Sequence, residues 1–209
     1  MCNLIYLLVL SWCVLAKVPS REERITIVEC HAKLREEVEP PASNMQLMSY
    51  STKMEKLAQD LFLHCDSGYP EFDPKYQDVG IVELTSENET PRYRDLCKVN
   101  GTTYSYNEDR CTGDCLSYLR MVWAASTEVG CATGRCANKA DPAERDDFII
   151  CTYKPSVLRF NARPYARGTS CTRCPTGYGC YRNQCRKDSL IIKHLQFPQC
   201  ITKSAMHFL

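Results

Sequence analysis

Three segments decide the fold of this chain. They read CTGDCLSYLRMVWAASTEVGCA (residues 111–132), DDFIICTYKP (146–155) and NARPYARGTSCTRCPTGYGCYRNQC (161–185). In the first, Leu116, Leu119, Val122 and Trp123 recur along one helical face, and the Thr-Glu-Val-Gly-Cys-Ala that follows is typical of a strand. The second is rich in β-branched and aromatic residues and predicts another strand. A helix, two strands and a cysteine-rich end are therefore expected in this order.

A first amphipathic helix is predicted before these segments. Ser20 and Glu23 have the spacing of a capping box, which marks a helix start. A helical face then runs from Ile27 to Val38. It ends before Pro40-Pro41, because proline cannot continue a helix.

A second helix is predicted by Thr52 and Glu55, which repeat the capping-box spacing. Its apolar stripe consists of Met54, Leu57, Ala58, Leu61, Phe62 and Cys65. Such a stripe should pack on a sheet. From residue 66 to 110, glycines and prolines interrupt every period, so we expect loops with one short helix. Helices and strands thus alternate around one core, which predicts an α/β fold of the three-layer α-β-α sandwich type.

The chain is expected to have four parts. Residues 1–16 form a signal peptide, because the apolar run at residues 3–15 is too short to span a bilayer and leads into small residues at cleavage spacing. An uncleaved membrane anchor is the alternative. Residues 20–165 form the sandwich, residues 166–185 a separate cysteine-rich hinge of two loops, and residues 186–209 a tail without a recognised pattern.

Cysteine usage points to an oxidising compartment. Removal of the signal peptide takes Cys2 and Cys13 from the 15 cysteines and leaves 13. Cytosolic thiols stay reduced, so this density behind a secretion signal indicates disulfides and a secreted, extracellular protein. The C-x2-C-x5-C-x4-C spacing of the hinge would in isolation suit zinc, but the same context favours bridges. The odd total means that one thiol stays free or forms a disulfide to another molecule, which would give a disulfide-linked dimer.

Sequons and charge agree with this compartment. Asn88 and Asn100 each begin an Asn-x-Thr glycosylation signal. The net charge is +1 and no basic block is present, so neither nucleic acid nor an anionic membrane surface is an expected partner.

These segments resemble the CAP superfamily of cysteine-rich secretory, antigen 5 and pathogenesis-related proteins. The resemblance rests on the Val-Trp and Gly-Cys of the first segment, the Cys-x-Tyr-x-Pro ending of the second, Pro164-Tyr165 and the four-cysteine hinge. It begins near residue 25, where the opening helix and a Pro-Pro-Ala-Ser-Asn-Met turn look most like those of venom allergen-like proteins of parasitic worms. It implies the same sandwich fold.

The resemblance also implies disulfide partners. The implied pairs are Cys65 with Cys136, Cys131 with Cys151, Cys171 with Cys180, and Cys174 with Cys185. Cys111 and Cys115 are expected to close a local loop. Cys30, Cys97 and Cys200 remain without an assigned partner, because sequence alone does not fix connectivity.

Many CAP proteins hold a divalent cation with two histidines and two glutamates. The resemblance places these four positions at Tyr69, Ile81, Asn100 and Ser117, none of which is an ordinary metal ligand. No metal and no cofactor are therefore expected. His64 is a possible substitute ligand, but a histidine beside an apolar stripe is more often structural.

No catalytic activity is expected either. A nucleophilic site would combine Ser117 with His31 or His64 and an acidic residue that orients the histidine. Ser117 lacks the strained Gly-x-Ser-x-Gly turn that exposes such a nucleophile.

Two binding functions remain. The first is a secreted, non-catalytic protein that acts on host or cell-surface proteins, as the likeness to venom allergen-like proteins implies; a rigid scaffold with long loops suits this role. The second is a carrier of a sterol or fatty acid. Some relatives hold sterols under a loop that corresponds here to residues 103–110, where Tyr104 and Tyr106 would stack on a rigid ligand.

Overall fold

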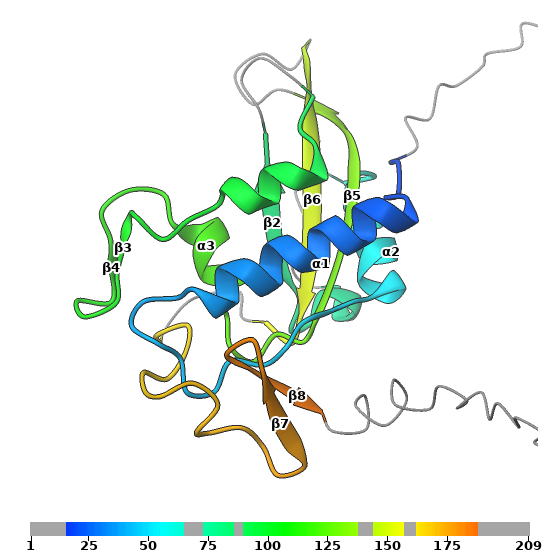
Figure 1. Cartoon of the computed structure of the whole chain (residues 1–209). Helices are drawn as coiled ribbons and strands as arrows, with labels where there is room; N and C mark the ends of the chain where they lie inside the picture. The colour runs from blue at the N-terminus through cyan, green and yellow to red at the C-terminus, as the bar shows by residue number, and fades with distance from the viewer. Residues whose placement is uncertain (1–15, 65–72, 86–89, 138–143, 157–161, 188–209) are drawn as a thin grey trace, which may run out of the picture.

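A computed structural model describes residues 16–64, 73–85, 90–137, 144–156 and 162–187. A four-stranded sheet stands between helices on both of its faces, with two small hairpins beside it (Figure 1). The helices are α1 (Arg21–Glu36), α2 (Thr52–Leu61), α3 (Leu116–Met121) and the 3-10 turns η1 (Pro74–Tyr76) and η2 (Tyr93–Lys98). The sheet contains β1 (Ser49–Tyr50), β2 (Gly80–Leu84), β5 (Glu128–Ala137) and β6 (Arg145–Lys154). The hairpins are β3 (Tyr104–Ser105) with β4 (Arg110–Cys111), and β7 (Tyr178–Tyr181) with β8 (Gln184–Lys187).

This architecture confirms the predicted three-layer α-β-α sandwich. Several residues named in the sequence analysis lie outside the described part of the chain: the signal peptide up to residue 15, Cys65, Tyr69, Asn88 and Cys200. Among the described residues, every helix is too short or too polar to cross a bilayer.

Strand alternation divides the core into two layers. The strands lie in the order β1-β5-β6-β2, with β1 parallel to β5 and the other pairs antiparallel. Successive side chains of a strand point to opposite faces. Cys131 of β5 and Ile149 of β6 therefore pack with α1, whereas the adjoining positions Ala132 and Ile150 pack with α2.

The start of α1 is as predicted. The Ser20 hydroxyl accepts a hydrogen bond from the Glu23 N–H at 3.2 Å, and the Glu23 carboxylate accepts one from the Ser20 N–H at 2.7 Å. This reciprocal pair is the capping box. The helix ends at Glu36, before the two prolines.

The start of α2 differs from the prediction. Ser51, and not Thr52, caps the helix, and its hydroxyl accepts from the Met54 N–H at 3.4 Å. Glu55 does not close a capping box, because both of its carboxylate oxygens accept hydrogen bonds from Arg24 at 2.9 Å. A tertiary ion pair has replaced the local contact.

The helix α2 sits directly on the sheet, as its stripe predicted. Met54, Ala58 and Leu61 are completely buried. A Cβ atom at Gly130 of β5 would lie 2.1 Å from the backbone nitrogen of Glu55. Only glycine permits this approach of helix to strand.

The strand β2 was missed by the sequence analysis, which expected loops from residue 66 to 110. Its residues pair antiparallel with β6, from Gly80 opposite Tyr153 to Leu84 opposite Ile149. Five residues are too few for a clear period, and the partner strand lies far along the chain. The expected short helix is present as η2, and η1 adds a second turn.

The helix α3 is shorter than predicted. It ends at Met121, so the helical face does not continue to Trp123. Leu119 is buried as expected, but Leu116 is 57% exposed. Tyr118 and Met121 occupy the inward positions instead.

Disulfides join the described parts of the chain. The bonds are Cys30–Cys97, Cys111–Cys115, Cys131–Cys151, Cys171–Cys180 and Cys174–Cys185. The last four coincide with the expected pairs, and the first joins two cysteines that had no assigned partner. Cys136 is also disulfide-bonded, while its expected partner Cys65 lies outside the described residues. The same holds for Cys200, so a dimer through an odd cysteine stays a prediction.

The hinge is docked on the sandwich rather than separate from it. The Cys185 N–H donates to the Met45 carbonyl at 2.6 Å, and the Leu47 N–H donates to the Cys185 carbonyl at 2.9 Å. The strand β8 thereby runs parallel to the chain that leads into β1. The hinge contains a hairpin, β7–β8, which extends to Lys187, two residues beyond the predicted boundary.

A single arginine strengthens this docking. Arg182, in the turn of the β7–β8 hairpin, donates to Glu36 at 2.7 Å and to Glu29 at 2.9 Å, and both acceptors lie on α1. Hydrogen bonds to Glu29 and Glu36 raise the pKa of Arg182 further above its usual range. The neighbouring Asn183 amide donates to the Glu36 carbonyl at 3.0 Å. The hairpin is therefore held at its tip as well as along β8.

Candidate functional site

The positions assigned to metal ligands do not share one face of the sheet. Ile81 lies on β2, and its side chain packs in the α2-side core layer. Ser117 lies on α3, whose Met121 packs with Val82 in the α1-side layer. Ile81 and the helix of Ser117 are therefore on opposite faces. Tyr69 lies outside the described residues.

Asn100 closes its own turn. It is exposed in the loop after η2, and its side-chain carbonyl accepts from the Thr102 N–H at 3.1 Å and from the Thr102 hydroxyl at 2.6 Å. Its amide donates to the Lys98 carbonyl at 3.2 Å. This is the local hydrogen bonding typical of asparagine in a turn.

Both ring nitrogens of His31 form hydrogen bonds within the core. Its Nδ1 donates to the Ile27 carbonyl at 2.7 Å, so Nε2 is the acceptor for the Tyr153 hydroxyl at 2.9 Å. Burial lowers the pKa of His31 to about 4. With both ring nitrogens engaged and the ring neutral, His31 has no free atom with which to activate Ser117.

His64 lies in a cluster of charged side chains that already contains a lysine. Its Nε2 lies 4.0 Å from the Asp60 carboxylate. The Lys75 ammonium lies 2.7 Å from Asp60 and 3.2 Å from Asp73. Lysine thus supplies the positive charge that a metal ion would bring. Among the residues that the structure describes, no three histidine, cysteine or acidic side chains are grouped to hold a metal ion.

Tyr104 and Tyr106, the residues expected to contact a lipid, pack in a cluster that also contains Tyr118 and Tyr165. We call these four residues the tyrosine cluster. The Tyr106 and Tyr165 rings stack with centroids 4.9 Å apart, and the Tyr104 ring lies 6.1 Å from that of Tyr118. All four rings contact the core layer that contains Leu119. Offset aromatic pairs at these distances are stabilising.

Hydrogen bonds fix the loop that carries the tyrosine cluster. The Tyr106 hydroxyl donates to the Tyr165 carbonyl at 2.9 Å and accepts from the Arg167 N–H at 3.0 Å. The Arg163 guanidinium donates to the Tyr106 and Asn107 carbonyls, each at 2.9 Å. Each of the two candidate lipid-contact rings is therefore occupied by contacts within the chain.

Arg35 is the largest buried polar side chain among the residues that the structure describes, and it was not anticipated. It is 1% exposed on α1. Its guanidinium donates to the carbonyls of Gln46, Met121, Trp123, Ala124 and Ser126 at 2.8–3.3 Å. Burial lowers the pKa of Arg35 to about 9, and five carbonyl acceptors keep it protonated at neutral pH. Arg35 joins the end of α3 to the chain that leads into β1.

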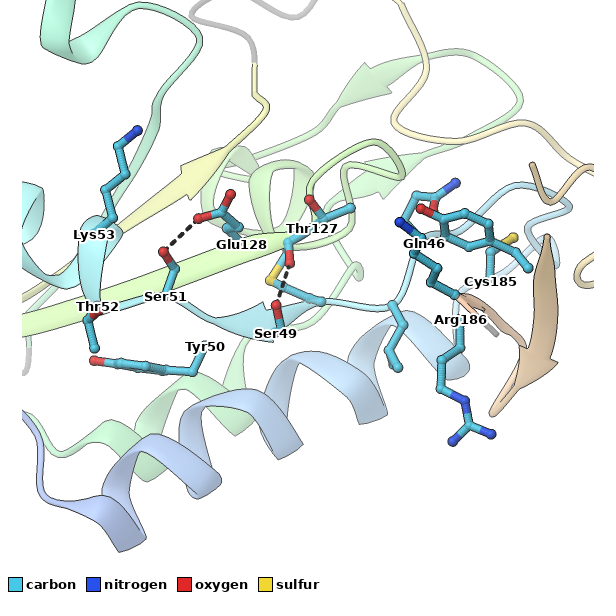
Figure 2. A pocket seen from close by; sticks show the side chains of 14 residues that line it. Gln46, Ser49, Tyr50, Ser51, Thr52, Lys53, Thr127, Glu128, Cys185 and Arg186 are labelled. Atoms are coloured by element: carbon cyan, nitrogen blue, oxygen red, sulfur yellow. Dashed lines mark hydrogen bonds between the residues drawn. The ribbon is translucent and has the colours of Figure 1, made fainter. Parts of the chain in front are cut away.

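An open groove lies beyond this junction, where β1 and the hinge hairpin diverge (Figure 2). It has a volume of about 590 Å³ and is lined by residues 46–53, 127–128, 178 and 185–187. We call it the edge groove. The Ser51 hydroxyl donates to the Glu128 carboxylate at 2.6 Å, and the Ser49 hydroxyl donates to the Thr127 carbonyl at 3.2 Å. Tyr50 is anchored by its hydroxyl, which donates to Glu55 at 2.5 Å.

Sequence reasoning did not predict the edge groove. The strand β1 has two residues, Ser49 and Tyr50, and no period can be read from two residues. The opposite wall belongs to the hinge, which was expected to stand apart. The Met-Ser-Tyr-Ser run before α2 was the available signal, because alternating apolar and polar residues suggest a short strand.

Comparison with known proteins agrees with this architecture. The family described as "CAP: Cysteine-rich secretory protein family" matches residues 28–153. Human GLIPR1-like protein 1 is 30% identical over 201 residues, which cover 88% of this chain and 82% of that protein. Peptidase inhibitor 15-A of Danio rerio is 30% identical over 190 residues, 79% of this chain and 70% of that protein.

A solved structure shows the same fold at lower identity. Venom allergen-like protein 4 of Schistosoma mansoni superposes with a TM-score of 0.56 and 23% identity, covering 71% of this chain and 97% of that one. A disulfide-braced α-β-α sandwich with a docked cysteine-rich hairpin is thus the class that fold and sequence define. The chain belongs to the CAP family of cysteine-rich secretory proteins.

Proposed function

We propose that this chain is a secreted, non-catalytic CAP protein that acts by binding another protein outside the cell, on a cell surface or in a host. The observation that carries the proposal is the state of His31, whose two ring nitrogens are committed to Ile27 and Tyr153 in a fully buried position. The disulfides and the exposed sequon at Asn100 support an extracellular location.

A rigid scaffold supports the same proposal. The tyrosine cluster and the Arg35 hydrogen bonds hold the loops around α3 in one arrangement. Pre-organised surfaces lower the entropic cost of protein binding. A sterol or fatty-acid carrier is the alternative, and it would require Tyr104 and Tyr106 to release the contacts that now satisfy them.

The test compares three ligands on the mature, glycosylated protein. We expect saturable binding of the fluorescently labelled protein to cells, and its loss after the cells are treated with trypsin. Labelled cholesterol and palmitate should show no saturable binding, and calorimetric zinc titration should give no stoichiometric heat. Tight zinc binding or saturable lipid binding, without a trypsin-sensitive surface site, would contradict the proposal.

A further inference from the structure

The main sheet ends at β1. Its neighbour on one side is β5, where the Ser51 N–H donates to the Val129 carbonyl at 2.8 Å, and the Ser49 N–H donates to the Thr127 carbonyl just before β5 at 2.8 Å. The amides of an extended chain alternate in direction, so those of Tyr50 and Thr52 point away from β5. Within the described residues, no strand pairs with this outer edge. A strand edge of this kind is a template for another extended chain.

The edge groove follows this open edge. The strand β8 pairs with the chain at Gln46, and beyond this point the two segments diverge (Figure 2). One segment is the run 46–53 and the other is the run 185–187, and both line the groove. An extended peptide bound between these two segments would lie against the outer edge of β1.

Each of these two segments ends in a lysine. Lys53 and Lys187 are exposed, and no ion pair holds either of them within the described part of the chain. Arg186 also lines the groove, and its guanidinium stacks on the Tyr181 ring at 4.2 Å. Glu128 is the acidic side chain of the groove, and its carboxylate accepts a hydrogen bond from the Ser51 hydroxyl. The ends of the groove are therefore positive.

We propose that the edge groove binds an extended, acidic segment of a partner protein, which pairs with the outer edge of β1 while its carboxylates meet Lys53 and Lys187. This is strand addition, in which backbone hydrogen bonds supply affinity and side chains supply selectivity. The inference rests on the proposed function and names its binding surface. A sulfated polysaccharide would use the lysines alone and would not need the strand edge.

The first experiment uses a fluorescein-labelled probe peptide, Glu-Val-Thr-Val-Glu with a blocked C-terminus, and measures fluorescence anisotropy against the mature protein. We expect saturable binding that weakens with salt. Two control peptides separate the contributions: one replaces both glutamates by lysine, and the other keeps the charges but carries N-methyl groups on alternate amides. Both should bind at least about tenfold more weakly.

Protein variants test the backbone edge and the lysine charge separately. Thr52→Pro removes one outward N–H, and proline is well tolerated here because Thr52 is the first residue of α2 and Ser51 is already extended. Loss of one hydrogen bond should weaken the probe about fivefold, with an unchanged melting temperature. Lys53→Glu should also weaken it about fivefold, whereas Lys56→Glu on the same helix should change it less than about twofold.

The outcomes distinguish this inference from the proposed function. Equal binding of the N-methylated peptide, or heparin binding that depends on Lys53 and leaves Thr52→Pro unaffected, would overturn strand addition. If Lys53→Glu together with Lys187→Glu retains full trypsin-sensitive cell binding, the edge groove is not the site and the proposed function stands. If the wild-type protein binds the probe but no cell surface, the groove stands and the extracellular role falls.

Discussion

The tyrosine cluster and the edge groove differ in what satisfies their polar groups. In the cluster, rings stack on rings, and the Tyr104 and Tyr106 hydroxyls donate to Asp109 and the Tyr165 carbonyl at 2.7 and 2.9 Å. In the groove, the outer backbone edge of β1 and the ammonium of Lys53 have no such partner in the described part of the chain. The loop expected to bind a ligand is therefore closed by contacts within the chain, while a strand edge that carried no sequence motif is open.

Both regions depend on Arg35, because its guanidinium holds Gln46 next to the groove and Met121 next to the cluster. Arg35→Met should lower the free energy of unfolding by about 4 kcal/mol, since it removes the guanidinium donor from five carbonyls, of which those of Trp123 and Ala124 keep a backbone donor. Urea denaturation measures this. Arg35→Lys retains three donors and should cost less. A loss below about 1 kcal/mol for Arg35→Met would show that the carbonyls find other partners.

The Cys30–Cys97 bond should affect the tyrosine cluster and not the edge groove, because η2, which carries Cys97, leads into the loop of the tyrosine cluster. Replacing both cysteines by serine should cost about 3 kcal/mol, mainly by freeing the unfolded chain. Near-UV circular dichroism of the tyrosines should weaken, while binding of the probe peptide to the native protein should persist. Loss of probe binding with an intact tyrosine signal would show that the bond supports the edge groove and not the tyrosine cluster.

The pH dependence of stability should report His31. Its folded pKa of about 4 lies below the ordinary value of 6.5, so the unfolded chain binds the proton first. The stabilisation is present above pH 6.5 and is lost as the pH falls toward 4. Between pH 7 and 4.5 the free energy of unfolding should decrease by about 2 kcal/mol. Urea denaturation across this window should lose most of the slope in His31→Gln, and an unchanged slope would assign it elsewhere.

The smallest effect is expected from Arg182→Ala, which releases the groove wall formed by the hinge hairpin from α1. Its partners are partly exposed, so we expect a loss of only about 1 kcal/mol. Hydrogen exchange should become faster in β7 and β8 but stay unchanged around Tyr106 and Tyr165. Faster exchange in both places would show that the two regions are not independent.

Sequence reasoning predicted the layers because they follow from local patterns. The capping box at Ser20 and the apolar stripe of α2 each specify an element within one stretch of chain. It missed β2, the Glu55–Arg24 ion pair and the edge groove, because each depends on a contact between distant residues. Glu55 is the clearest case, since its spacing fits a capping box but its carboxylate binds Arg24 from another helix.

Backbone amide mapping by NMR during titration with the Glu-Val-Thr-Val-Glu peptide tests the central claim most directly. We expect the largest shifts at Tyr50, Thr52, Lys53 and Lys187, with little change in the tyrosine cluster. Shifts concentrated at Tyr104, Tyr106 and Ser117, with the β1 edge unaffected, would contradict it.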